Sequence, residues 1–485
     1  MATALLASAR PVVVAVTGSI GMGKSTATKW WRTLGVRVHD SDACVHDLYS
    51  PGGAAVPAVS AAFPGVVAPD GSIDRQLLSA ALPFYKDGRD AGLKLLEQIV
   101  HPLVLHNRTL FVDQAMAAGE WLVVVDIPLL FETCESEAQL KEVCDVVLVV
   151  SAPREIQRQR VLKRPGMTPE KFAFIDSKQV PDSEKCKRAD FVINTGYPTK
   201  AMARAQLARC YRTLVERYEG QYRAWLERGG GPATPIRCVT LDLDDCLWPV
   251  MPPIIAAQRA LLSAVEVHLP KSFAAGLCDR EAVKATMAPM FERHPMLAHD
   301  FTELRRLALE EAAVAHGDDP ALAEQVMEAF LLARSDVSEH IFSDVLPAIT
   351  KLRQAGLTVG AMTNGNCDVT QCLHGYFDFA VTAGEVGAAK PDPLPFLQAA
   401  GLAGCHPHQV VHVGDSPLAD VCGAMRVGMR TILLTRPEIN ERSTSELAEI
   451  PAADPSRWRE HTSLSDAVET ILNDQLFRGE ANAAA

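Results

Sequence analysis

Residues 18–25 read Gly18-Ser19-Ile20-Gly21-Met22-Gly23-Lys24-Ser25, which fits the pattern G-x-x-x-x-G-K-S/T. A β-branched run from Pro11 to Thr17 precedes this loop and predicts a buried parallel strand, and Thr26 to Leu34 can continue as a helix. Glycines let successive backbone N–H groups point into one concavity, and a helix N-terminus with a lysine adds positive charge there. The stretch therefore predicts a site for a nucleoside triphosphate.

This phosphate-binding loop supplies most of the expected nucleotide contacts. The alternative is a glycine turn before an ordinary helix, and the order of strand, loop, Lys-Ser and helix argues against it. Ser25 is the expected Mg²⁺ ligand through its hydroxyl, so ATP and Mg²⁺ are the expected cofactors. The residues expected to bind ATP here are Gly18, Ser19, Ile20, Gly21, Met22, Gly23, Lys24, Ser25 and Thr26.

Composition limits the class of protein. A chain of 485 residues is too long for one core, so two or three domains are expected. The net charge of −12 (47 basic against 59 acidic side chains) offers no electrostatic footprint for nucleic acid, and no apolar run reaches the length of a membrane span. The twelve cysteines form no C-x-x-C pair, which favours a reducing compartment, and the residues before the first strand are too few for a convincing transit peptide. A cytoplasmic location is expected.

Further apolar runs in the first 200 residues alternate with helical patterns. Such alternation predicts a parallel sheet with helices on both faces, and ligands then bind at the carboxyl ends of the strands. This rule brings the phosphate-binding loop, Asp40, Asp42 and residues 128–132 to one edge. The strands expected after the first are 36–40, 122–126, 146–150 and 191–193.

Residues 12 to about 225 resemble the dephospho-CoA kinases. The motifs that carry the resemblance are the loop Thr17–Thr26, Asp40-Ser41-Asp42, Asp70–Arg75, His101-Pro102, Ile127–Glu132, Arg160 with Arg164, Gln179, Lys185 and Ala189–Asn194. The resemblance implies transfer of the ATP γ-phosphoryl group to the ribose 3′-hydroxyl of dephospho-CoA. Phosphoryl transfer depends on positioning and charge neutralisation, which suits this set of residues.

The resemblance also implies a role for individual residues. Lys24 would serve the β and γ phosphates, and Asp42 would orient or deprotonate the attacking hydroxyl, with Asp40 as a supporting partner. Arg160 and Arg164 would belong to a lid that closes over ATP and excludes water. Asn194 would line the adenine pocket, although the Asp that usually precedes this Asn is absent here. The segment from Lys200 to Leu226 is expected to form one long helix with an apolar core stripe.

A linker rich in glycine and proline separates two units. Gly229 to Pro235 reads GGGPATP, in which glycines add flexibility and prolines block regular structure. The expected division is a first domain over 1–228, a linker over 229–236, a second domain over 237–475 and a tail over 476–485.

The second unit begins with a strand, 237–241, that leads into Asp242-Leu243-Asp244. Two carboxylates at i and i+2 beyond a strand can act as nucleophile and acid/base around a shared Mg²⁺. Three later stretches give this pair a context: 357–365 ending in Thr-Asn-Gly, 387–393 containing Lys390, and 410–420 containing Gly-Asp-Ser-Pro-Leu-Ala-Asp. Together the four motifs resemble the haloacid dehalogenase superfamily, over residues 237 to about 470.

This second resemblance implies a phosphatase that acts through an aspartyl-phosphate. Asp242 would be the nucleophile and Asp244 the general acid/base, while Thr363 and Lys390 would hold the phosphoryl oxygens. The Mg²⁺ ligands implied are Asp242, Asp244 and Asp415, with Asp420 in support. Cys246 replaces a usual Thr whose hydroxyl is structural, so activity is expected to survive.

A mostly helical insert, about 250–342, resembles the helical cap of this superfamily and favours a small phosphorylated metabolite as substrate. The predicted fold class is thus α/β, with two doubly wound parallel-sheet domains: a P-loop kinase with a helical lid and substrate region, and a haloacid dehalogenase-like Rossmannoid domain with a cap. Two alternatives remain open. The first domain would phosphorylate another small alcohol, or the second would be a non-catalytic binding or regulatory module.

Overall fold

The computed structural model describes residues 10–86, 88–228, 234–437, 439 and 457–474. Residues 229–233 of the expected linker and the expected tail 476–485 lie outside this part of the chain. The chain divides into two compact units, one comprising the described parts of Met1–Trp31, Val36–Gly196 and Gly220–Trp225, and the other those of Arg32–Gly35, Tyr197–Glu219 and Leu226–Ala485. The domain boundaries at 228 and 237 stay a prediction.

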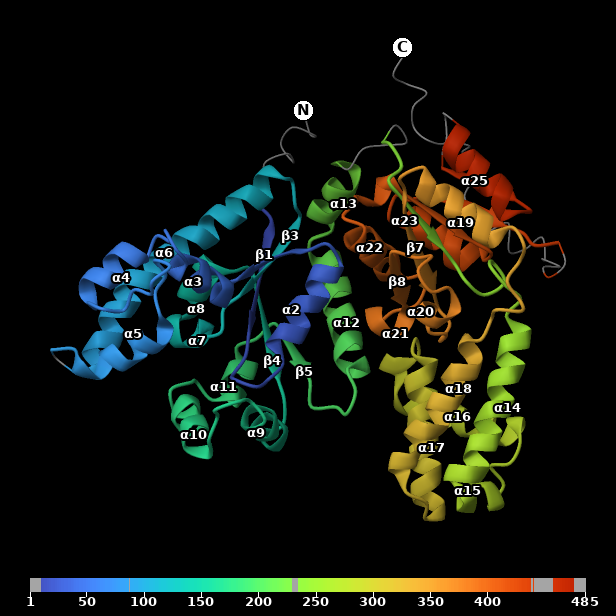
Figure 1. Ribbon diagram of the computed structural model, residues 1–485, viewed down its shortest axis with the longest axis horizontal. Helices are drawn as coiled ribbons and strands as arrows, with labels where there is room; N and C mark the ends of the chain where they lie inside the picture. The colour runs from blue at the N-terminus through green and yellow to red at the C-terminus, as the bar shows by residue number, and fades with distance from the viewer. Residues whose placement is uncertain (1–9, 87, 229–233, 438, 440–456, 475–485) are drawn as a thin grey trace, which may run out of the picture. The chain divides into compact units, whose positions relative to one another are not determined.

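The first unit is built on a five-stranded sheet in the order β2-β3-β1-β4-β5, with every pair parallel. All six side chains of β1 are buried, because a central parallel strand is covered on both faces. The predicted strands are confirmed, with ends that move by one residue at most (Figure 1). The strands are β1 (Val12–Thr17), β2 (Arg37–Asp40), β3 (Leu122–Asp126), β4 (Val146–Ser151) and β5 (Phe191–Asn194).

Helices cover this sheet and extend beyond it. Two of them begin at aspartate N-caps, since Asp40 accepts from the backbone at the start of α3 and Asp74 does so at the start of α5. Residues 1–228 contain the helices α2 (Lys24–Thr33), α3 (Ser41–Tyr49), α4 (Val56–Ala62), α5 (Arg75–Ala81), η1 (Leu82–Phe84), α6 (Arg89–Ala117), α7 (Leu130–Thr133), α8 (Glu137–Val143), α9 (Arg154–Leu162), α10 (Pro169–Ser177), α11 (Asp182–Lys187), α12 (Ala201–Arg217) and α13 (Glu219–Arg228).

The expectation of one helix from Lys200 to Leu226 is wrong, because the segment forms α12 and α13. Tyr218 leaves the helical region with φ −121° and ψ 37°, and Gly220, a weak helix former, follows two residues later. The apolar stripe is nevertheless core, since Leu207, Tyr211 and Leu214 are buried.

The second unit contains a six-stranded parallel sheet in the order β11-β10-β9-β6-β7-β8. The sequence identified three of these strands but not β8, β10 and β11. Strand β8 buries only one of its four side chains, and the apolar run of β10 is only three residues long, so neither carries a strong local pattern. The strands are β6 (Cys238–Leu241), β7 (Thr358–Thr363), β8 (Phe379–Thr382), β9 (Val410–Gly414), β10 (Arg430–Leu434) and β11 (Trp458–His461).

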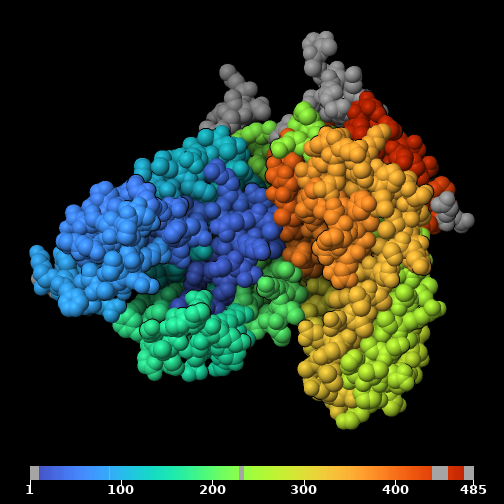
Figure 2. Space-filling model, viewed as in Figure 1, coloured from blue at the N-terminus to red at the C-terminus, as the bar shows by residue number. Residues whose placement is uncertain are grey.

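The insert between β6 and β7 is helical, as predicted, and its helices α14 to α18 form a lobe with its own apolar core (yellow-green to gold in Figure 2). The cap helices are α14 (Met251–His268), α15 (Pro270–Ala274), α16 (Arg280–Arg293), η2 (Pro295–Leu297), α17 (Phe301–His316), η3 (Pro320–Leu322) and α18 (Ala323–Ser335). The remaining helices are α19 (Val345–Gln354), α20 (Val369–Cys372), α21 (Ala383–Val386), α22 (Pro393–Leu402), η4 (Pro407–Gln409), η5 (Pro417–Cys422), α23 (Gly423–Arg426) and α25 (Leu464–Asn473).

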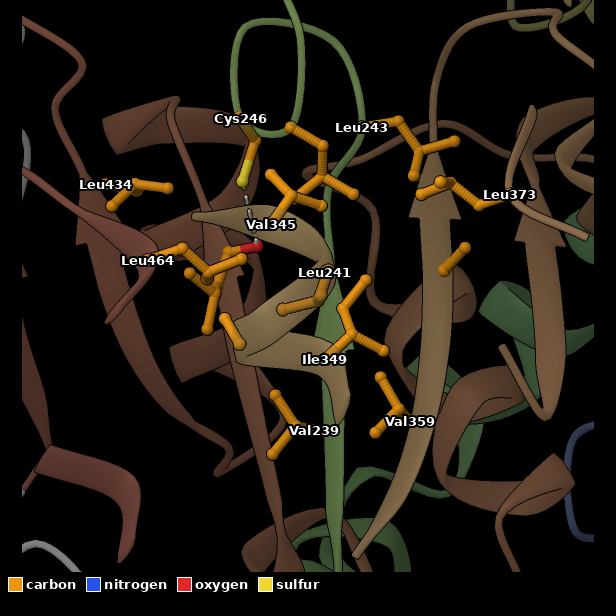
Figure 3. Close-up of a cluster of buried hydrophobic side chains, with 14 of the residues drawn as sticks. Val239, Leu241, Leu243, Cys246, Val345, Ile349, Val359, Leu373, Leu434 and Leu464 are labelled. Carbon is orange, nitrogen blue, oxygen red and sulfur yellow. Dashed lines mark hydrogen bonds between the residues drawn. The ribbon is translucent and has the colours of Figure 1, made fainter. Parts of the chain in front are cut away.

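A core cluster of the second unit lies on one face of its sheet, under α19 and α25 (Figure 3). Cys246 is fully buried in it, and its Sγ donates to the backbone oxygen of Val413 at 4.0 Å. Burial raises the pKa of this thiol well above its usual value, so it stays protonated. The thiol thus keeps a donor at the position where the superfamily usually has a hydroxyl.

All twelve cysteines are free thiols. Among the described residues, no helix combines the length and the apolar character needed to cross a membrane.

We expect Val345→Ala to destabilise the second sheet, because Val345 is fully buried in this cluster and its lost methyl groups leave a cavity. The cost should be about 2 kcal/mol, which corresponds to about 30-fold faster amide exchange in β6 and β9 by mass spectrometry. The matched control is Val267→Ala, whose side chain is 70% exposed on α14. Equal exchange in the two variants would contradict the prediction.

Candidate active sites

The phosphate-binding loop follows β1 directly, and its glycines are needed for its shape. Gly18, Gly21 and Gly23 have φ values of 147°, 81° and 99°. A Cβ at Gly18 would lie 2.3 Å from the backbone oxygen of Val150, and one at Gly21 would lie 2.5 Å from the Val161 side chain. Only glycine therefore fits at these positions, and α2 begins at the next residue, Lys24.

Lys24 closes the loop, since its Nζ donates to the backbone oxygen of Gly18 at 2.8 Å. Burial lowers the pKa of Lys24, while the carboxylates of Asp126 and Asp42 oppose this effect. The predicted phosphate-binding lysine and the predicted acid/base Asp42 thus belong to one electrostatic site. Ser25 and Thr26 are exposed beside the lysine in the first turn of α2.

Asp126 is a residue of this site that the sequence analysis missed. It ends β3, and its register partner on β1 is Val16, close to the phosphate-binding loop. Ser41 Oγ donates to the backbone oxygen of Asp126 at 2.6 Å, while the Asp40 side chain accepts from the N–H of Asp42 at 3.1 Å. An apolar strand that ends in Asp was the available signal, but only the sheet order places that strand beside β1.

Side chains from distant segments fix the backbone of the loop. The amide Nε2 of Gln157 donates to the backbone oxygen of Ile20 at 2.9 Å, and Gln179 Oε1 accepts from the N–H of Ile20 at 3.2 Å. Thr195 Oγ1 donates to the backbone oxygen of Met22 at 2.7 Å. Gln157 and Thr195 carried no signal in the sequence, because each acts through a long-range contact with the loop.

The two predicted lid arginines lie in different surroundings. Arg160, on α9, donates to Thr195 Oγ1 at 2.9 Å and to the backbone oxygen of Thr195 at 2.6 Å. Arg164 is exposed just beyond that helix. Asn194 Oδ1 accepts from the N–H of Gly196 at 2.8 Å, so it shapes the turn after β5. The roles of these residues toward ATP stay predictions.

A buried ion pair links two motifs that the sequence singled out. Lys185 is fully buried, and its Nζ lies 2.9 Å from Glu132 Oε1. The same oxygen accepts from the N–H of Val180 at 2.8 Å. The pair therefore holds α7 and α11 together beside the loop-binding residue Gln179.

In the second unit, Lys390 lies between two carboxylates. Its Nζ donates to Asp242 Oδ1 at 2.7 Å and to Asp420 Oδ1 at 2.6 Å, and all three side chains are buried. Burial lowers the pKa of Lys390, but Asp242 and Asp420 outweigh it and raise the value overall. Asn364 holds the lysine backbone, with Asn364 Oδ1 accepting from the Lys390 N–H at 2.8 Å.

His412 supports Asp420 from β9, which the sequence did not indicate. Its Nε2 lies 3.0 Å from Asp420 Oδ1, and the N–H of Ser416 donates to Asp420 Oδ2 at 2.9 Å. Burial opposes ionisation of Asp420, yet Lys390 and His412 hold its pKa well below the usual range. Asp420 is therefore a fixed anion that orients Lys390.

The carboxylates at this edge fit a divalent cation. One oxygen each from Asp242, Asp415 and Asp420 lies within 4.8 Å of the others. Burial raises the pKa of Asp242 well above its usual range, and Asp420 and Asp415 raise it further, although Lys390 opposes them. A single lysine thus leaves excess negative charge, and oxygen ligands of this kind suit Mg²⁺. Asp244 as a ligand remains a prediction.

Asp244 is held by the cap. Arg334 Nη2 donates to both of its carboxylate oxygens at 2.6 Å, and Trp248 Nε1 donates to Oδ1 at 3.2 Å. A Cβ at Gly365 would lie 2.6 Å from Asp244 Oδ2 and 3.0 Å from Thr363 Oγ1, so glycine leaves room where these groups meet. Arg334 was missed because it lies far from the motifs in sequence.

These two arrangements define a P-loop kinase site in the first unit and, in the second, a hydrolase site in which the predicted nucleophile Asp242 is buried beside Lys390. The chain belongs to the dephospho-CoA kinase family through its N-terminal half, since residues 12–199 match the family profile described as dephospho-CoA kinase. Residues 236–428 match the profile of haloacid dehalogenase-like hydrolases. The chain is therefore an enzyme with a kinase domain and a hydrolase domain.

Individual proteins are similar to parts of this chain. The dephospho-CoA kinase of Novosphingobium aromaticivorans is 51% identical over 208 residues, which cover 43% of this chain and 97% of that protein. That of Mesorhizobium japonicum is 52% identical over 210 residues, 43% of this chain and 98% of that protein. The crystal structure of a 2-haloacid dehalogenase from Pseudomonas syringae is 34% identical and covers 49% of this chain and 99% of its own, with a TM-score of 0.42.

We expect Thr195→Val to weaken ATP binding, because it removes the hydroxyl that joins Met22 to Arg160. The loss of these hydrogen bonds should raise the Kd for a fluorescent ATP analogue about 5- to 20-fold. The control is Thr213→Val, whose hydroxyl bonds only within α12, to the backbone of Arg209. Unchanged ATP affinity in Thr195→Val would show that the loop does not depend on this contact.

Proposed function

We propose that the N-terminal domain transfers the ATP γ-phosphoryl group to the ribose 3′-hydroxyl of dephospho-CoA and so produces coenzyme A. The observation that carries this proposal is the meeting of Lys24, Asp42 and Asp126 at the carboxyl ends of β1, β2 and β3. Transfer of a phosphoryl group to an alcohol needs a cation near the phosphate and a carboxylate that can accept the hydroxyl proton. Lys24 and the exposed Asp42 can supply these, with Asp126 as a second carboxylate. Membership of the dephospho-CoA kinase family supports the choice of substrate.

Each residue of the kinase site then has a defined task. The amides of the loop and Lys24 bind the β and γ phosphates, and Ser25 is the Mg²⁺ ligand. Mg²⁺, when bound, supplies neutralisation of phosphate charge. Asp42 accepts the proton of the ribose 3′-hydroxyl. At the same time the 3′-oxygen forms a bond to the γ-phosphorus, and the bond from that phosphorus to ADP breaks. Arg160 and Arg164 neutralise charge and exclude water, and Asn194 contacts adenine.

We expect Lys24→Ala to reduce ATP-dependent conversion of dephospho-CoA to coenzyme A by about 100-fold or more, since it removes a cation aimed at the transferred group. Lys29→Ala is the control, because Lys29 is exposed on the same helix, α2. Conversion is measured by chromatography with purified protein. If the wild type binds ATP but phosphorylates only another alcohol, the substrate assignment is wrong.

For the C-terminal domain we propose a Mg²⁺-dependent phosphatase that acts on a small phosphorylated metabolite. Asp242 attacks phosphorus, and Asp244 protonates the leaving alkoxide oxygen as the P–O bond breaks. Asp244 then takes a proton from water, which attacks the aspartyl-phosphate and releases phosphate. Thr363 and Lys390 hold the phosphoryl oxygens throughout.

The ion is proposed to lie among Asp242, Asp244 and Asp415, with Asp420 in support. Mg²⁺, when bound, supplies charge neutralisation among these carboxylates and the phosphoryl group. The free thiols also support our proposal of a reducing compartment such as the cytoplasm.

We expect Asp242→Asn to abolish phosphatase activity and to leave the formation of coenzyme A unchanged, because the amide cannot act as the nucleophile. The measurement is phosphate release from a panel of phosphate monoesters with Mg²⁺ present. The control is Asp466→Asn, an exposed residue in the first turn of α25. Identical phosphate release by Asp242→Asn and wild type would instead favour a non-catalytic C-terminal module.

A further inference from the structure

A large cavity lies between the cap helices and the catalytic loops of the second unit. Its volume is about 1270 Å³, and Asp244, Asn364 and Gly365 line it on the catalytic side. The cap contributes Arg305 from α17 and Arg334 from α18, two helices that lie side by side (Figure 1). The cavity is therefore continuous with the proposed acid/base. Its wall carries both signs of charge, since Glu324 and Glu328 of α18 line it together with the arginines.

Arg305 carries a charge that nothing in the described part of the chain neutralises. Its guanidinium stacks on the Phe330 ring at 4.2 Å, while its Nη1 is buried without a hydrogen-bond partner among the described residues. Burial lowers the pKa of Arg305 to about 10, so the group stays charged at neutral pH. Arg305 as a whole is half-buried, and a partly desolvated cation without an anion is costly, so this side chain is a candidate for binding an anionic ligand.

Carboxylates near Arg305 in sequence are used by another arginine. Arg306 donates to Glu303 at 2.7 Å and also pairs with Glu310, while Asp300 caps α17 by accepting from the N–H of Glu303. Within the described residues no carboxylate forms an ion pair with Arg305. Two glutamates of α17 thus neutralise the charge of Arg306, whereas no carboxylate among the described residues does so for Arg305.

Arg334 supplies a second donor on the same wall. Its side chain is 2% exposed, and its Nη2 is bound to Asp244. Its Nη1 is buried and has no partner among the residues described. Arg334 follows Phe330, on which Arg305 stacks, by one helical turn, or about 6 Å along α18. Arg305 and Arg334 thus line one cavity, from the proposed acid/base toward the interior of the cap, and the Nη1 atom of each is buried behind that wall.

We propose that this cavity binds a second anionic group of the hydrolase substrate, a carboxylate or a further phosphate, through Arg305, with Arg334 on the same wall. The proposal rests on the proposed phosphatase activity and adds the class of its substrate. That substrate is a short phosphate monoester with an anion a few carbon atoms from the ester oxygen. Arg305 determines specificity, whereas Arg334 also positions Asp244.

The test compares matched substrates on the full-length protein with Mg²⁺. One series consists of ω-carboxyalkyl phosphates with chains of increasing length, another of α,ω-alkanediol bisphosphates, and the third of simple alkyl phosphates of equal length. We expect kcat/KM for the best anionic member to exceed that of its alkyl counterpart about 10- to 100-fold. The first two series show whether the second anion is a carboxylate or a phosphate.

Variants at Arg305 separate binding from structure. Arg305→Met keeps an unbranched side chain against Phe330, and we expect it to lower kcat/KM for the anionic series to that of the alkyl series and not to lower the melting temperature of the free protein. Arg305→Lys should restore part of the preference. The control is Arg293→Met, a surface arginine of α16 that pairs with Glu311.

Different results would overturn different claims. Hydrolysis of alkyl phosphates as fast as that of their anionic counterparts would overturn the anion site and leave the phosphatase intact. The anion site would also fail if Arg305→Met reduced all three series equally or lowered the melting temperature. If no phosphate ester were hydrolysed by folded protein with Mg²⁺, the proposed phosphatase itself would be wrong.

Discussion

The parallel pairing of the strands is the constraint on which both sites depend. Parallel neighbours bring their carboxyl ends to one edge, so residues from separate parts of the chain meet there. In the first unit β1 pairs with β3, which puts the phosphate-binding loop beside Asp126. In the second unit β6 pairs with both β7 and β9, which brings Asp242 to Thr363 at the end of β7 and to the loop that carries Asp415. Each site is therefore a consequence of sheet order.

Charge balance explains what gathers at these edges. Lys390 is buried and Lys24 half-buried, and in both sites carboxylates offset the resulting loss of hydration. Lys24 remains partly available, because only the backbone oxygen of Gly18 accepts from its ammonium among the described residues. Lys390 is held on two sides by Asp242 and Asp420. The first arrangement leaves the ammonium of Lys24 available to bind an anionic ligand. The second holds Asp242, the proposed nucleophile, in a fixed position.

Much of the fold was predictable, since periodicity reports on local structure. Short runs rich in apolar residues, alternating with helical patterns, identified all five strands of the first sheet, and helical patterns identified the cap. Predictions failed where a local signal was weak, as in the short strand β8, or misleading, as in the break at Tyr218. The site lysines and aspartates were found because motif spacing and resemblance mark them. Their partners Thr195, His412 and Arg334 were not found.

The sequence by itself determined which groups are available for chemistry: a phosphate-binding loop whose backbone requires glycine, a strand followed by Asp242 and Asp244, and the order of the motifs. These are local properties, set by allowed backbone angles and residue types. Only the tertiary structure decided that Asp126 faces Lys24, that Arg334 holds Asp244, and that Arg305 has no anionic partner among the described residues. Such contacts depend on sheet order and helix packing between distant segments, about which local periodicity carries no information.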